Sequence, residues 1–532
     1  MSRLLARCAP LLLLTLLLIQ LGLEQQVWLS RNGIPDGYQN EYLHVGNAMD
    51  LFGSFLARDA WHLRYYLSTN YWPPGFYLWP WPLMMALGAT HRVMVLSNLG
   101  HLALLLWSVY RLGELARDRV TGLFAMGLVS LYPAIFGNLM RYEPNVAVAA
   151  WVSVAALWWL RSDGLRRRGP ALCFGLACGV GLLMDRLSLA VFFVGPVLTA
   201  LPGLLRRERR VNVGLALLVL LLVAGWWHAA FVHLHLDEVL TQSGAGEIDS
   251  TGEMTERRGF FSWMNLLYYP LALIEGQAGL LPGLLALVGL GFAGRRGPVE
   301  RLCASVALGA MLIFTLLAKK QIYYTVPSLG VLAVLSASWL RGLGRPGVAV
   351  GFVVLLAGLH QHGLRLWGRG LPLPAGLAED LGAASWGERA LVPWHPQCLP
   401  PRDLELPVDA LAASLGEGDI IAFSEDQTWY EGYLVLQLRE RLPGRIVRGV
   451  VGDPQGSYEW LGVATNFVYV AADDGARWPT EERLDALLRQ HHYDPDSLPP
   501  VAEAVAEAGG RFEMVEHWPL QDGVQLWVWR ER

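Results

Sequence analysis

Long apolar stretches separated by short polar linkers fill the first 365 residues of the chain. The stretch VNVGLALLVLLLVAGWWHAAFV, for example, is long enough to cross about 30 Å of hydrocarbon as a helix. The first apolar stretch follows a basic start and lacks an A-x-A-like cleavage site, so we expect a retained helix rather than a signal peptide. Hydropathy predicts about eleven transmembrane helices, at 8–29, 91–110, 120–140, 145–160, 171–184, 187–204, 211–232, 279–294, 302–318, 325–340 and 348–364.

Charge predicts the orientation of these helices. The linkers after the second, fourth, sixth, eighth and tenth stretches are all arginine-rich: RLGELARDR, RSDGLRRRG, RRERR, AGRRGPVER and RGLGRPG. Because short arginine-rich linkers stay in the cytoplasm, we expect these five linkers and the N-terminus there. An odd number of spans then places the C-terminus on the extracytoplasmic side.

Three larger segments are expected on the outer side: a first loop at 30–90, a second loop at 233–279, and a tail at 366–532. The tail alternates short β-branched runs, GDIIAFS, RIVRGVV, NFVYVAA, RFEMVEHW and VQLWVW, with helical patterns near 426–441 and 480–491. This pattern predicts a small extracytoplasmic α/β domain. We therefore divide the chain into a transmembrane domain at 1–365 and a tail domain at 366–532.

Composition supports a polytopic α-helical membrane protein. The chain is 53% hydrophobic and only 17% charged, with a net charge of −4. It has no basic stripe or nucleic-acid motif, so nucleic acid is not an expected partner. The five cysteines lie mostly in or beside apolar runs, in a spacing that favours packing over disulfides or zinc binding.

The first outer loop carries an acidic motif, RNGIPDGYQNEYLH. If the segment is helical from Gln39 onward, Glu41 and His44 lie on one face, with Asp36 just before the helix. Two nearby carboxylates suit general-base chemistry on a hydroxyl. A capped, solvated loop helix is the alternative.

Three further outer turns carry charge beside aromatic residues. They contain Arg141, Tyr142 and Glu143; Asp185 and Arg186; and Lys319, Lys320, Tyr323 and Tyr324. The two lysines are the only lysines in the chain. Cations at this depth can bind a phosphate at the membrane surface. Local ion pairs at helix ends, and lysines that extend to lipid headgroups, are the alternatives.

The order of these landmarks resembles a known family. PDGYQNEYLH, YWPPGFYLWP, RYEP, GLACGVGLLMDR and LAKKQIYYTVPSLGVLAVLSA follow one another as in the GT-C glycosyltransferases. The stretch 1–365 most resembles the dolichyl-phosphate-mannose protein mannosyltransferases (glycosyltransferase family 39) and the bacterial lipid A aminoarabinose transferases.

The resemblance implies a transferase in the bacterial cytoplasmic (inner) membrane. Its donor would be a polyprenyl-phosphate sugar held among membrane lipid, and its acceptor the hydroxyl of a lipid, glycan or protein. Asp36 and Glu41 would supply the base for an inverting displacement. Lys319, Lys320, Arg141 and Arg186 would bind the donor phosphate. His44, Asn40, Tyr142, Glu143, Asp185, Tyr323 and Tyr324 would contact the substrates.

The sequence departs from the family in two places. Asn40 occupies the position of an expected aspartate, so either Glu41 takes over or Asp36 reaches in. A lysine is often found in the family where this chain has Asp185 or Arg186. No cofactor is expected, although Asp36, Glu41 and His44 are ligand types that suit a divalent metal.

Three other functions are compatible with these features: a transporter or flippase of lipid-linked sugars, a non-catalytic scaffold, and a ligase or polymerase of lipid-linked glycans. Transporters usually show internal repeats and polar residues at mid-membrane, and neither is clear in this sequence.

Overall fold

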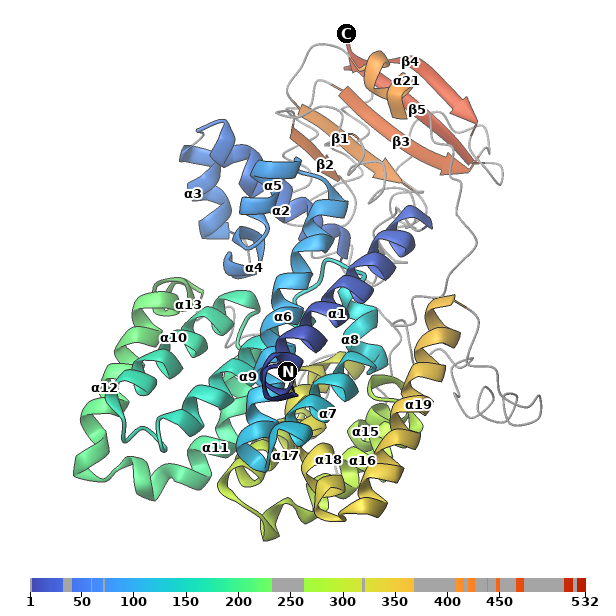
Figure 1. The fold of residues 1–532 in the computed structure, drawn as a ribbon. Helices are drawn as coiled ribbons and strands as arrows, with labels where there is room; N and C mark the ends of the chain where they lie inside the picture. Colours follow the sequence, from blue (N-terminus) through green and yellow to red (C-terminus); the bar gives the residue numbers. More distant parts are fainter. Residues whose placement is uncertain are drawn as a thin grey trace. The chain divides into compact units, whose positions relative to one another are not determined.

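The computed structural model describes two compact units. Residues described are 2–31, 41–58, 60–69, 72–231, 263–317, 321–367, 408–415, 420–425, 438, 446–449, 466–472, 511–519 and 524–532. The first unit comprises Met1–Asn32, Tyr65–Ala86 and Arg92–Pro400. The second comprises Gly33–Arg64, Leu87–His91 and Pro401–Arg532 (Figure 1).

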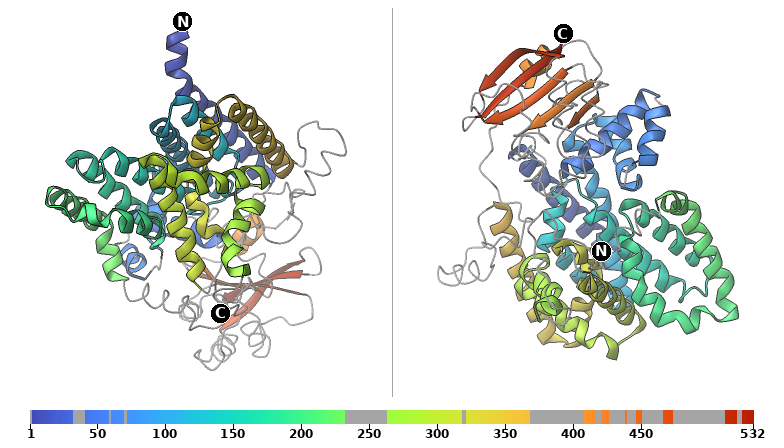
Figure 2. Two further views of the ribbon diagram at one scale, coloured as in Figure 1. Left: turned by 90° about the horizontal axis from the view of Figure 1, so that it is seen from below. Right: turned by 180° about the vertical axis from the view of Figure 1, so that it is seen from behind.

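The described residues of every apolar stretch predicted to span the membrane lie on helix, apart from short breaks. The helices are α1 (Ser2–Arg31), α6 (His91–Ala116), α7 (Arg119–Ser130), α8 (Pro133–Leu139), α9 (Asn145–Arg161), α10 (Arg168–Met184), α11 (Ser188–Leu204), α12 (Arg207–Leu220), η2 (Leu221–Gly225), α13 (Trp226–Ala230), α16 (Leu280–Phe292), η5 (Ala293–Arg295), α17 (Pro298–Leu316), α18 (Leu329–Gly342) and α19 (Arg345–Trp367). Figure 2 shows them as a bundle of helices seen from two further sides.

Length and hydropathy single out some of these helices as membrane spans. Among the described residues, five helical segments are long and apolar enough to cross a membrane, or six if α7 and α8 form one bent span. Four shorter apolar segments contain α9, α10, α11 and α16. The fold is thus that of a polytopic helical membrane protein, while the number of eleven crossings stays a prediction.

A proline explains the bend between α7 and α8. Their axes differ by 61°. Pro133 is the first residue of α8, and Tyr132 before it is extended, with φ −69° and ψ 123°. A proline ring disfavours the helical conformation in the residue that precedes it, so the helix is interrupted there.

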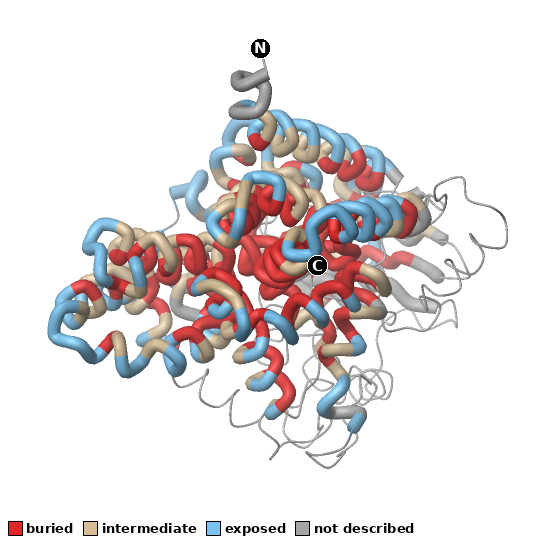
Figure 3. Tube along the Cα trace, turned by 60° about the horizontal axis from the view of Figure 1, so that its bottom comes forward, coloured by how far each residue is buried: buried red, intermediate tan, exposed pale blue. Residues whose placement is uncertain are grey.

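Buried residues gather in the middle of the helical unit (Figure 3). Glycines let helices approach closely there: a Cβ on Gly175 would collide with the Ala216 backbone of α12, and a Cβ on Gly195 with the Ser305 backbone of α17. Small residues at crossings are the usual way to pack helices in lipid, where no hydrophobic force drives them together.

The predicted outer loops contain helices of their own. The first loop holds α2 (Glu41–Leu56), α3 (Ala60–Thr69), α4 (Gly75–Leu78) and α5 (Trp81–Leu87). Of the second loop, 232–262 lies outside the described residues, and the rest forms α15 (Trp263–Ala272) and η4 (Leu273–Gln277). A short 3-10 helix, η6 (Ile322–Ser328), precedes α18.

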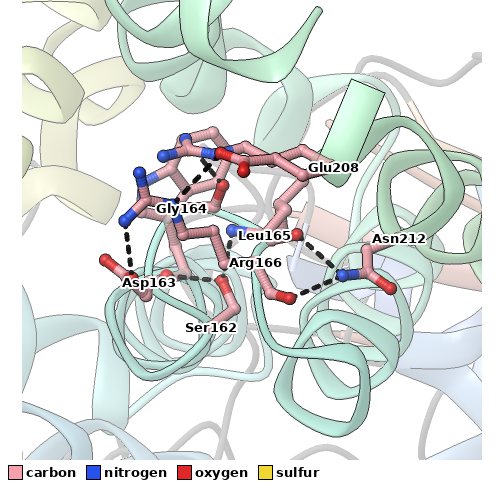
Figure 4. A network of polar contacts seen from close by, with 9 residues as sticks. Ser162, Asp163, Gly164, Leu165, Arg166, Glu208 and Asn212 are labelled. Carbon is pink, nitrogen blue, oxygen red and sulfur yellow. Dashed lines mark hydrogen bonds and ion pairs between the residues drawn. The ribbon is translucent and has the colours of Figure 1, made fainter. Parts of the chain in front are cut away.

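The turn between α9 and α10 shows how an arginine-rich linker is held (Figure 4). Three consecutive residues have positive φ, namely Asp163, Gly164 and Leu165. Asn212 of α12 donates to the Leu165 carbonyl at 3.1 Å, and Arg209 donates to the Gly164 carbonyl at 3.0 Å. Arg166 lies 3.3 Å from Asp163 and 3.8 Å from Glu208. Arg166 is thus paired with acids of the same protein, and Arg209 and Asn212 hold the backbone of the turn.

The second unit contains a five-stranded mixed sheet. Its strands are β1 (Ile420–Glu425), β2 (Ile446–Gly449), β3 (Asn466–Ala472), β4 (Phe512–Pro519) and β5 (Val524–Glu531), beside α21 (Val408–Ser414). Their order is β2-β1-β3-β5-β4. β1 is parallel to β2 and β3, whereas β5 is antiparallel to β3 and β4.

All five predicted strand segments are confirmed as strands. The predicted helices at 426–441 and 480–491 lie outside the described residues, except for Leu438. The domain boundary at 365 and the outer location of the tail stay predictions.

Candidate functional site

Charged and aromatic residues from four segments of the first unit form what we call the turn cluster. Its members are Trp72, Arg141, Tyr142, Glu143, Asp185, Arg186, Tyr323 and Tyr324. They come from the residues before α4, the α8–α9 turn, the α10–α11 turn and η6. All of them except Trp72 were predicted as site residues.

Asp185 is fixed by the residues that follow it. It ends α10 in an extended conformation, and its carboxylate accepts the Arg186 amide hydrogen at 2.9 Å. The Ser188 hydroxyl, at the start of α11, donates to its other oxygen. A carboxylate held by two donors keeps one orientation, which matters wherever a charge must act in a defined direction.

Arg186 stacks on an aromatic ring. Its guanidinium carbon lies 4.1 Å from the centroid of the Trp72 ring, a cation–π contact. Trp72 precedes Pro73 and Pro74, which lead into α4. α4 packs tightly on the end of α10, because a Cβ on Gly75 would lie only 2.6 Å from the Leu183 carbonyl oxygen.

Tyr323 interacts electrostatically with three charged residues of the turn cluster. The charges of Arg186, Glu143 and Asp185 all act on its hydroxyl, so these four side chains share one electrostatic environment. The ring of Tyr324 lies 5.3 Å from that of Tyr323. Asp185, Arg186 and both tyrosines keep a small exposed fraction, whereas Glu143 is buried.

The Arg141–Glu143 turn is buried and tied to its surroundings. Asn98 of α6 donates to the Arg141 carbonyl at 2.5 Å. The Tyr142 hydroxyl donates to the Phe76 carbonyl at 2.9 Å, and burial raises the pKa of this phenol well above its ordinary value. Asn145 donates to Glu143 at 3.1 Å. Neutral polar side chains thus hold the backbone at Arg141 and the carboxylate of Glu143.

A glutamine anchors η6. Gln277, in η4, donates to the Ile322 carbonyl and to the Thr325 hydroxyl, the latter at 2.8 Å. These bonds fix the segment that carries Tyr323. Lys319 and Lys320 lie just before it but outside the described residues, so their role stays a prediction.

The acidic motif belongs to the second unit. Glu41 is the first residue of α2 and is completely buried, and His44 lies one turn later and is also buried. The Glu41 carboxylate contacts Nε2 of His91 at 2.8 Å. Asp36 and Asn40 lie outside the described residues. Among described residues, no group of three or more potential metal ligands is found.

Several residues of these sites were missed from the sequence: Trp72, Asn98, Ser188, Gln277 and His91. One signal was available for some of them, since polar side chains such as Asn98 stand inside predicted spans, where they are expensive and commonly functional. For Trp72, nothing distinguished it from the neighbouring interfacial aromatics.

Known proteins share both sequence and fold with this chain. No protein-family model matches the sequence. It is 31% identical over 253 residues to an undecaprenyl phosphate-alpha-4-amino-4-deoxy-L-arabinose arabinosyl transferase of Pseudomonas paraeruginosa, covering 42% of this chain and 43% of that protein. The protein of the same name from Pseudomonas aeruginosa is 30% identical over 252 residues. The chain thus spans less than half the length of the curated relatives it matches.

The structural match is longer. A crystal structure of ArnT from Cupriavidus metallidurans bound to undecaprenyl phosphate covers 97% of both chains with a TM-score of 0.59 and 15% identity. The apo state of that protein covers 91% of this chain with a TM-score of 0.55. These matches confirm the resemblance to GT-C glycosyltransferases and to the aminoarabinose transferases among them.

Proposed function

We propose that this chain is a membrane glycosyltransferase that moves a sugar from a polyprenyl-phosphate donor to an acceptor hydroxyl at the extracytoplasmic face of the bacterial inner membrane. The observation that carries the proposal is the turn cluster, where Arg186 and two carboxylates share one environment with Tyr323. The similarity to undecaprenyl-phosphate aminoarabinose transferases supports the donor class.

Arg186 suits the departing phosphate. As the bond between the sugar and the lipid phosphate breaks, negative charge grows on the phosphate oxygens. A cation already held in place stabilises that charge without having to reorient during the reaction. Stacking on Trp72 holds Arg186 in this way. We propose that Arg141, Lys319 and Lys320 assist it.

Asp36 and Glu41 are the proposed base. One of them removes the acceptor proton, so that the hydroxyl oxygen attacks the anomeric carbon and inverts it. The contact with His91 fixes the direction in which Glu41 presents its carboxylate. We propose that the reaction uses no cofactor. A divalent ion at Asp36, Glu41 and His44 would instead make turnover sensitive to EDTA.

The proposed orientation places the N-terminus in the cytoplasm and the tail outside, with eleven spans between them. The five arginine-rich linkers support it. They join α6 to α7, α9 to α10, α11 to α12, η5 to α17 and α18 to α19. The turn cluster lies at the opposite ends of α9 and α10, with residues just before α9 and just after α10.

The test is sugar transfer by the purified protein in nanodiscs. Radiolabelled undecaprenyl-phosphate 4-amino-4-deoxy-L-arabinose and polyprenyl-phosphate hexoses are supplied as donors, and sugar release is followed. Asp36→Asn or Glu41→Gln should slow release by about 10²–10⁴-fold while donor binding is kept. Lys319→Ala/Lys320→Ala should weaken donor binding and turnover together.

Glu114→Gln, which removes a carboxylate from the arginine-rich end of α6, is the matched control and should stay near wild type. Full transfer by both carboxylate variants would contradict the proposed base. Donor translocation in wild type without sugar release would identify a flippase instead.

A further inference from the structure

Arginines from two arginine-rich linkers of the first unit contact one residue of α18, Ser338. Arg117, at the end of α6, donates its Nε hydrogen to the Ser338 hydroxyl at 3.2 Å. Arg296, just before α17, donates to the Ser338 carbonyl at 3.0 Å. The Ser338 hydroxyl in turn donates to the buried carboxylate of Glu300 at 2.7 Å. Both guanidinium groups are thus held by the same residue.

The two guanidinium groups also meet at one point. A Cβ on Gly342, one helical turn after Ser338, would lie 2.8 Å from Nη2 of Arg296 and 3.0 Å from Nη2 of Arg117. Gly342 is exposed, so the two terminal nitrogens converge at the protein surface. The absence of a side chain at 342 gives them this space.

The positive charge here is only partly balanced. Among the described residues, neither Arg117 nor Arg296 forms an ion pair with a carboxylate; Glu300 hydrogen-bonds Ser338, and its charge only partly offsets that of Arg117 at Arg296. Burial and the charge of Arg117 lower the pKa of Arg296. Nearby Arg341 differs, because it pairs with Asp118 at 2.8 Å. A bound anion would relieve the repulsion between Arg117 and Arg296.

We propose that Arg117 and Arg296, held by Ser338 at Gly342, bind a phosphate group at the arginine-rich end of the helical unit. Two forked guanidinium groups at one point match the several acceptor oxygens of a phosphate. Basic sites between helices at a membrane surface bind anionic headgroups, so a phospholipid is one source and free phosphate the other.

The test is native mass spectrometry of the full chain in detergent, titrated with phosphatidylglycerol and, separately, with inorganic phosphate. Arg117→Gln/Arg296→Gln should weaken phosphatidylglycerol binding on the order of 10-fold, since each basic residue near the surface contributes to headgroup affinity. Gly342→Ala should also weaken it while keeping both charges, because the new Cβ displaces only flexible arginine tips.

Arg206→Gln/Arg207→Gln is the matched control, since it removes the same charge from exposed positions on another arginine-rich linker. Displacement of the lipid by millimolar inorganic phosphate would identify free phosphate as the ligand, and lipid binding that resists it would identify the headgroup. Unchanged binding in the Arg117/Arg296 variant, or equal loss in the control, would overturn the proposal.

Discussion

The two ends of α9 and α10 use arginine differently. At the turn cluster, Arg186 lies half-buried against Trp72, close to Glu143 and Asp185. At the other end, Arg166 pairs with exposed acids, as in Figure 4. An exposed pair in water contributes little, whereas a fixed charge in a partly dry site acts strongly on a neighbouring charge. Whether an arginine has a chemical role or only anchors a turn therefore depends on how buried it is and on which groups surround it.

Replacing one arginine at each end of α9 and α10 is the strongest test of this difference. Arg186→Gln should lower sugar release on the order of 10²-fold or more, because a fixed cation no longer faces the departing phosphate. Arg166→Gln should leave release within about twofold of wild type, since it loses only exposed pairs. Single-turnover release of labelled sugar in nanodiscs measures both, and similar losses in the two variants would remove the distinction.

The packing beneath the turn cluster is the next test. Gly75→Ala should destabilise the protein by about 1–3 kcal/mol, because its Cβ would lie 2.6 Å from the Leu183 backbone and push α4 from the end of α10. Gly214→Ala, where a Cβ meets nothing within 4 Å, should instead stabilise α12 by up to about 1 kcal/mol. Denaturant unfolding of the two variants compares them. Equal stabilities would show that the close approach at Gly75 is readily relaxed.

A smaller, pH-dependent effect is expected at the arginine-rich end. Partial burial acts to raise the pKa of Asp118, but hydrogen bonds from Thr121 and Arg341, with the Arg341 charge, bring that pKa below its ordinary value. A depressed pKa adds stability at neutral pH that disappears as the pH falls through the folded-state pKa. Because both partners are 38% exposed, we expect less than about 1 kcal/mol.

Asp118→Asn tests this effect, since asparagine keeps the cap on α7 while losing the charge. Thermal unfolding should show wild type slightly more stable at pH 7, and the difference should vanish in acid. A difference that grows as the pH falls would have the wrong sign for a depressed pKa.

The local pattern of apolar and β-branched residues was sufficient to predict where the helices and strands of this protein lie. The described residues of every predicted apolar span lie almost wholly on helix, because a backbone in hydrocarbon must satisfy its own hydrogen bonds. The five tail strands were equally visible in short β-branched runs. The sequence also indicated that Glu143, Asp185, Arg186 and Tyr323 share one end of the helices, because charge patterning orients the linkers.

Contacts between distant segments were decided only by the tertiary structure. The stacking of Trp72 on Arg186, the anchoring of η6 by Gln277 and the meeting of Arg117 with Arg296 at Gly342 join residues far apart in the chain. Each depends on how a helix is rotated and tilted against its neighbours. Hydropathy averages over all faces of a helix, so it determines where a helix runs but not which side chains it brings together.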